Sequence, residues 1–168
     1  MKNELKINRL IALMLMFVLS SCLKSGLDKE LPAFADAKIT DVFFEYRYLD
    51  SDSHSSDGSN LVRVVQLPVS NKQFKLKESA PGASTDSIIA TVTVPSSDKF
   101  TPQTERDKVT ASYLVCKTNI STAARIEPVA TAPKMGTPGD FSFPQQYKVI
   151  AADGQVERIW TLKIILAK

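Results

Sequence analysis

The 168-residue sequence carries 21 basic and 18 acidic side chains, with 43% hydrophobic residues and a single histidine. Its formal net charge of +3 is small, and Lys and Arg form no cluster with interleaved aromatic residues, which argues against nucleic acid as a partner. One histidine excludes an HExxH zinc site, and the six glycines form no GxxxxGK or GxGxxG phosphate loop. No cofactor is therefore expected.

The first 22 residues have the layout of a bacterial lipoprotein signal. Basic residues precede the unbroken apolar run Leu10–Leu19, which is about half the roughly 20 residues that a bilayer-spanning helix needs. The run ends in Leu19-Ser20-Ser21-Cys22, which resembles the lipobox, where the cysteine thiol takes diacylglycerol before cleavage. We expect removal of residues 1–21 and lipidation of Cys22.

Cleavage before Cys22 leaves 147 residues with 18 basic and 17 acidic side chains, so the processed chain is close to neutral. Residues 22–35 lack periodicity and are interpreted as a flexible tether that could reach roughly 45 Å. Residues 36–168 have the length of one domain. The protein is expected to be an outer-membrane lipoprotein that faces the periplasm or the cell surface, with the membrane as a partner through the lipid on Cys22.

Alternation of apolar and polar residues with period two predicts strands throughout this domain. In the first strand, Val42, Phe44, Tyr46 and Tyr48 share one face. The polar stretch 50–60 is expected to be the loop of a hairpin with a second strand over 61–69. Pro95 should end the third strand because proline has no N–H for a ladder. The first four strands are expected at 39–48, 61–69, 87–94 and 109–118.

The final hairpin is the clearest local pattern. Residues 146–152 lead into Asp153-Gly154, a pair that favours a tight turn, and residues 158–166 return. On the return strand Trp160 lies on the same face as Leu162 and Ile164, which predicts that the indole is in the core. The domain is therefore expected to be all-β, an antiparallel sandwich of immunoglobulin type.

The same C-terminal residues resemble the ending of a lipoprotein domain family of unknown function in Bacteroidetes. The resemblance lies in Asp140-Phe141-Ser142-Phe143-Pro144, Tyr147-Lys148-Val149, Asp153-Gly154 and Trp160-Thr161-Leu162. It extends over roughly residues 37–168 and implies an immunoglobulin-like fold and a place in the cell envelope. It implies no biochemical activity.

Chemically active residues are few. His54 lies among small polar residues with nothing to fix a tautomer, so we expect no catalytic role. With Cys22 lipidated, Cys116 has no partner for a disulfide and is interpreted as a small buried hydrophobic residue. Asp50, Asp52 and Asp57 form a weak candidate for a Ca²⁺ site, although the loop lacks the glycine and glutamate of an EF-hand. No other metal site is expected.

Two further sites are hypotheses. Tyr46 and Tyr48 could contact a ligand such as a sugar, because the opposite face of their strand also carries apolar residues. Asp86-Ser87-Ile88 resembles the three-residue O-glycosylation site of exported Bacteroidetes proteins, which makes Ser87 a candidate acceptor.

These patterns favour a non-enzymatic, lipid-anchored module of the cell envelope that contacts an unknown protein or glycan. One alternative is a surface glycan-binding lipoprotein of a polysaccharide-uptake system, which an exposed aromatic pair would favour. Another is a fimbrial-type subunit, which an exposed groove or an exchangeable strand would favour.

Overall fold

The computed structural model describes residues 34–79 and 82–168, apart from the side chains of Ser51 and Asp52. The expected signal segment, Cys22 and nearly all of the expected tether lie outside the described residues, so their roles stay predictions. No helix in the described part of the chain is long and apolar enough to span a membrane.

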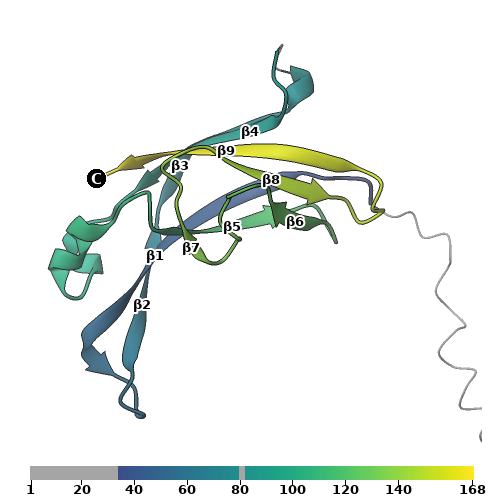
Figure 1. Ribbon diagram of the computed structural model, residues 1–168. Helices are drawn as coiled ribbons and strands as arrows, with labels where there is room; N and C mark the ends of the chain where they lie inside the picture. Colours follow the sequence, from purple (N-terminus) through teal and green to yellow (C-terminus); the bar gives the residue numbers. More distant parts are fainter. Residues whose placement is uncertain (1–33, 80–81) are drawn as a thin grey trace, which may run out of the picture. The chain divides into compact units, whose positions relative to one another are not determined.

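Two β-sheets pack face to face (Figure 1). The first has four strands in the order β2-β1-β5-β7, and the second has five in the order β3-β4-β9-β8-β6. The predicted all-β, two-sheet class is therefore confirmed. The strands are β1 (Ile39–His54), β2 (Asn60–Leu67), β3 (Val69–Lys75), β4 (Asp86–Thr93), β5 (Leu114–Ile120), β6 (Arg125–Pro128), β7 (Pro138–Gly139), β8 (Gln145–Ile150) and β9 (Glu157–Ala167), with short 3₁₀ helices η1 (Lys77–Ser79), η2 (Ser97–Lys99) and η3 (Gln103–Lys108).

The first hairpin is longer than predicted. β1 continues to His54 and β2 begins at Asn60, so only residues 55–59 form the loop. The Ser55 N–H donates to the Ser59 carbonyl at 2.8 Å, and Gly58 has a φ of 82°, which glycine adopts without strain. The expectation of a loop over 50–60 is wrong because polar side chains of a twisted two-stranded ribbon face solvent while its backbone still pairs.

Pro68 divides what the sequence predicts as one strand over 61–69. β2 pairs with β1 up to Leu67, and β3 starts at Val69 in the other sheet. Since proline has no N–H, it ends the first ladder. Its carbonyl accepts a 2.9 Å hydrogen bond from Thr93 and so joins the second sheet.

Two other expectations need correction. β5 begins at Leu114, and not at Val109, because a turn closed by the Tyr113 N–H and the Thr110 carbonyl at 3.2 Å precedes it. In addition, β4 and β9 run parallel, with Asp86 opposite Trp160, so the sandwich is not wholly antiparallel.

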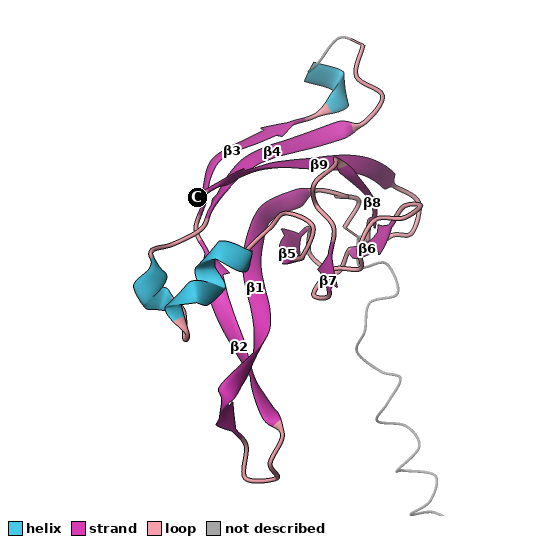
Figure 2. Cartoon of the chain, turned by 60° about the vertical axis from the view of Figure 1, so that its left-hand side comes forward, coloured by secondary structure: helices cyan, strands magenta, loops and turns pink. Residues whose placement is uncertain are grey.

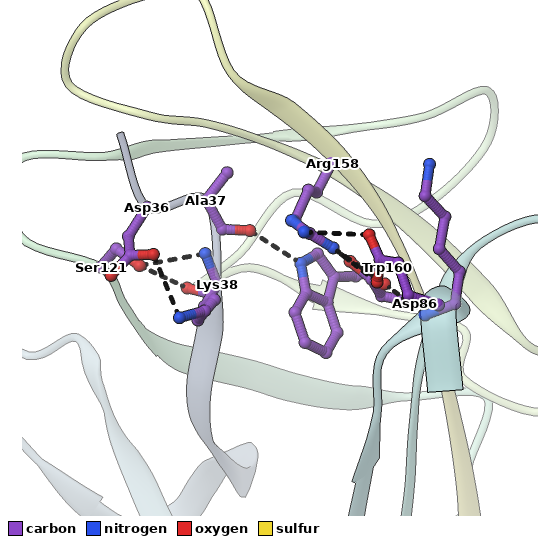
Figure 3. Close-up of polar contacts among 9 residues, drawn as sticks. Asp36, Ala37, Lys38, Asp86, Ser121, Arg158 and Trp160 are labelled. Carbon is purple, nitrogen blue, oxygen red and sulfur yellow. Dashed lines mark hydrogen bonds and ion pairs between the residues drawn. The ribbon is translucent and has the colours of Figure 1, made fainter. Parts of the chain in front are cut away.

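The core between the sheets follows the predicted alternation. Val42 and Phe44 of β1 meet Ile88 of β4 and Leu162 of β9, all at most 1% exposed. Trp160 is also 1% exposed, which confirms its place in the core. Figure 3 shows its indole Nε1 donating to the Ala37 carbonyl, at 3.1 Å, where the chain enters the domain.

Figure 3 also shows the buried carboxylate of Asp86, at the start of β4. Asp86 is 1% exposed and accepts hydrogen bonds from the Arg158 guanidinium at 3.1 and 3.3 Å. The Lys77 N–H donates to the same carboxylate at 2.7 Å. The carboxylate therefore holds the start of β4 and the loop before it against β9.

Candidate binding site on the β1–β2 arm

The β1–β2 hairpin extends past the strands of the second sheet in both views of the chain (Figures 1 and 2). We call its residues 47–64 the arm. On the arm, the face that would point to the core has no opposing sheet. At Tyr48 the inner face is instead covered by the segment that carries η2 and η3, and the outer face stays open.

Tyr46 and Tyr48 lie on the inner face, as the alternation predicts. Their rings stack with centroids 5.6 Å apart, and Phe100 lies 6.4 Å from the ring of Tyr48. The Tyr46 hydroxyl donates to the Glu105 carboxylate at 2.9 Å. Burial, together with that carboxylate, raises the pKa of Tyr46. The Tyr48 hydroxyl accepts a 3.0 Å hydrogen bond from the Thr101 N–H.

The two tyrosines therefore differ in access. Tyr46 is buried, whereas Tyr48 is half-buried. Tyr48 and Tyr113, which is half-exposed, both line a hollow of about 190 Å³ on the arm. The lining of this hollow is nearly all apolar and comprises Arg47, Tyr48, Leu49, Val62, Tyr113 and Pro138.

A buried carboxylate holds Arg47, one of the residues that line the hollow. Glu45 belongs to the outer face of β1, yet its side chain is only 1% exposed. Gln66 Nε2 donates to it at 2.9 Å, and both Lys117 and Arg47 form ion pairs with it. Burial alone would raise the pKa of Glu45, but the hydrogen bonds from Lys117, Gln66 and Arg47 outweigh it and lower the pKa below its ordinary value.

Arg47 is thereby fixed at the rim. Its Nε donates to Glu45 at 2.6 Å and one terminal nitrogen donates to the Gly136 carbonyl at 3.1 Å. A guanidinium has five N–H donors, and the contacts described for Arg47, including its ion pair with Glu45, use three of them. These contacts hold the guanidinium in one orientation beside the hollow.

Of the two tyrosines that the sequence singles out, Tyr48 lines the hollow and Tyr46 does not, and the sequence pattern did not indicate the other lining residues. Tyr113 and Pro138 come from segments more than 60 residues from Tyr48 in the sequence, and nothing in their local pattern links them to it. Leu49 and Val62 are directly opposite in the β1–β2 register. The pairing of these two residues was not predicted, because the first strand was expected to end at residue 48 and to be followed by a long loop.

The other predicted residues lie apart from the hollow. His54 is exposed at the end of β1. Cys116 is buried, as predicted, and burial raises the pKa of its thiol. Ser87 is half-buried within β4, between β3 and β9.

The three aspartates of the weak Ca²⁺ candidate have different settings. The Asp50 carboxylate is buried and pairs with Arg63 at 2.8 Å, whereas Asp57 accepts from the Ser59 N–H in the exposed turn at 2.9 Å. The side chain of Asp52 lies outside the described residues. Among the residues that are described, no group of three His, Cys, Asp or Glu side chains could hold a metal ion.

Comparison with known proteins identifies a family and several similar solved structures. The model of the DUF5018-related family matches residues 39–163. A crystal structure of a Bacteroides fragilis protein assigned as secreted is 36% identical, with a TM-score of 0.65, and the match covers 82% of this chain and all of that one.

A Bacteroides thetaiotaomicron protein assigned as a glycoside hydrolase is 20% identical with a TM-score of 0.39, and the match covers 85% of this chain but 28% of that one. No curated protein matches the chain.

Proposed function

The chain belongs to the DUF5018-related family, and from that premise we propose that it is a lipid-anchored, non-enzymatic interaction module of the bacterial cell envelope. The observation that carries the proposal is the hollow on the arm. It combines an apolar lining with a fixed guanidinium, and it opens on a part of the molecule that no second sheet covers.

The envelope location is supported by the signal-like N-terminus and by the similar Bacteroides fragilis protein, which is assigned as secreted. The lipid on Cys22 would hold the protein at the outer membrane, on its periplasmic or its outer face. Two or three acyl chains, at about 0.8 kcal/mol per buried methylene, make spontaneous release negligible.

Metabolic labelling with radioactive palmitate tests the anchor. The full-length protein should be labelled and recovered with membranes, and Cys22→Ala should abolish both results. Cys116→Ala is the matched control, because a buried thiol should take no lipid. Label that persists in Cys22→Ala would contradict the anchor and leave the binding site untouched.

Binding at the hollow would combine apolar contact with a charge-assisted hydrogen bond. Leu49 and Val62 are 65% and 59% exposed, so an apolar partner group would remove considerable surface from water. The Glu45 cluster holds one negative and two positive charges, and its cations Arg47 and Lys117 are partly exposed. A partner with an acceptor or anionic group beside its apolar group therefore fits best.

A photo-reactive amino acid in the full-length protein tests this site in intact cells. At Leu49 it should give a defined cross-linked product that mass spectrometry identifies. At Ile165, which is 53% exposed on β9, it should give none. Equal products at both positions, or turnover of a substrate that a single Asp or Glu substitution abolishes, would contradict the proposal.

A glycan-binding role is the second candidate, and the observation that favours it is that two tyrosines, Tyr48 and the half-exposed Tyr113, line the hollow together with Arg47. Aromatic rings with a few fixed polar groups form a surface on which a sugar could stack. On a glycan array, Tyr113→Ala should abolish any signal while Leu49→Asn reduces it less. A protein partner should give the reverse order.

A further inference from the structure

The two sheets have four edge strands, and three of them are protected against pairing with another chain. Exposed edges are usually blunted by short length, charge, proline or a bulge. β7 has only two residues, and β6 has four with two charges and Pro128. β3 carries Lys72 and Lys75, and its register shifts between Ser70 and Gln73.

β2 is the exception. It is eight residues long, and it is the outermost strand of its sheet. Its register with β1 is unbroken from Leu61 to Leu67, so the strand has no bulge there. Val62 and Val64 on one face are 59% and 50% exposed, and Leu61 on the other is 40% exposed.

The charge of this edge does not oppose self-association. Arg63 is the one charged residue of β2, and the Asp50 carboxylate neutralises it through a 2.8 Å ion pair. An identical edge can therefore approach without net repulsion. The processed chain, with 18 basic and 17 acidic side chains, adds little long-range repulsion.

We propose that β2 pairs antiparallel with β2 of a second copy of this chain, about a two-fold axis at Val64. This register uses all of residues 61–67 and places Leu61 opposite the partner's Leu67. Arg63 lies opposite the partner's Val65, so the two Arg63 side chains are diagonal to each other and not directly opposite. Centring on Arg63 would instead put like charges directly opposite, which destabilises a strand pair. The two sheets that contain β1 and β2 become one continuous sheet.

The pairing goes beyond the proposed function and does not depend on it. It also has a consequence for the hollow, since Val62 lines the hollow and belongs to β2. Two hollows would lie on the same continuous sheet, which makes the dimer bivalent toward a repetitive partner.

Disulfide trapping in the full-length protein tests the register. Residues on the axis of an antiparallel pair have Cα atoms about 4.5–5.5 Å apart, within the range that a disulfide spans. Val64→Cys in native membranes should give a band of twice the chain mass under mild oxidation, lost on reduction. Ile165→Cys, equally exposed on β9, is the control and should stay a single chain.

A second measurement uses the chain without a new cysteine. Sedimentation of the detergent-solubilised protein should give the mass of two chains, and Val64→Lys should weaken association at least tenfold while Ile165→Lys does not. A single-chain mass throughout, no trapped dimer with Val64→Cys, or equal trapping at Ile165 would each overturn the proposal.

Discussion

The core around Trp160 and the arm around Tyr48 are built from the same alternating pattern, but their apolar side chains differ in burial. Trp160 and Leu162 of β9 face the other sheet and are buried. Tyr46 and Tyr48 of β1 face the η2–η3 segment instead, and Leu49 on the reverse face stays 65% exposed. Alternation therefore predicts which residues share a face, whereas burial depends on what lies opposite.

The two regions also use buried carboxylates differently. In the core, Asp86 holds a loop and β4 against β9 through Arg158 and the Lys77 N–H. At the base of the arm, Glu45 holds two partly exposed cations and Gln66 on an open sheet face. The first arrangement closes the sandwich, and the second keeps Arg47 ready at the rim of the hollow.

Trp160→Ala should have the largest effect on stability. The indole is fully buried and donates to the Ala37 carbonyl, so its removal leaves a cavity and an unpaired acceptor. We expect a loss of about 3–5 kcal/mol in the free energy of unfolding, measured by urea denaturation. A loss below about 1 kcal/mol would show that this region is no better packed than the arm.

Glu45→Gln should have the next largest effect, because it replaces a carboxylate that accepts from Arg47, Lys117 and Gln66. We expect a loss of about 2–3 kcal/mol near neutral pH. The folded-state pKa of Glu45 is lowered, so its stabilisation is present above the unfolded-state pKa of about 4.3 and is lost as the pH falls through the folded-state value.

The measurement is the difference in unfolding free energy between the unaltered protein and Glu45→Gln as the pH is lowered. That difference should shrink toward acid. Asp98→Asn is the matched control, since Asp98 is an exposed carboxylate outside the cluster, and its effect should be small. A difference for Glu45→Gln that is constant with pH would contradict the role of its charge.

Gly139→Ala should destabilise by about 1–2 kcal/mol through crowding. A Cβ at Gly139 would lie 2.2 Å from Cβ of Pro133, a rigid ring that cannot move aside easily. Thermal unfolding of this variant can be compared with Gly139→Ala combined with Pro133→Ala. Partial recovery in the double variant is expected, and none would mean that the strain lies elsewhere.

Tyr113→Ala should have a small effect on stability, less than about 0.5 kcal/mol, because half of the side chain is already exposed to solvent. Its effect on partner binding should be larger than its effect on stability. Measuring both binding and the free energy of unfolding distinguishes the arm from the core, because a change in core packing is expected to lower the free energy of unfolding. If Tyr113→Ala lowered the free energy of unfolding as much as Trp160→Ala, the proposed difference in packing between the arm and the core would be wrong.

Much of the fold could be predicted from local pattern, since the inward faces of β1, β4 and β9 agree with alternation. The break at Pro68 could have been found from the missing N–H alone. The parallel pairing of β4 with β9 could not, because strand order depends on contacts between residues about 70 positions apart. Tyr113 and Pro138 could not be assigned to the site for the same reason, so only the structure identifies the complete lining of the hollow.

The length of β1 has a mechanical consequence. Its 16 residues run from the entry of the chain to the tip of the arm, about 50 Å of extended backbone. A pull between an anchor upstream of Phe34 and a partner at the tip would load this one covalent strand. A partner held along β2 would load the β1–β2 ladder in shear, where many hydrogen bonds resist together. In both cases the loaded strand includes Val42 and Phe44, which belong to the core that contains Trp160.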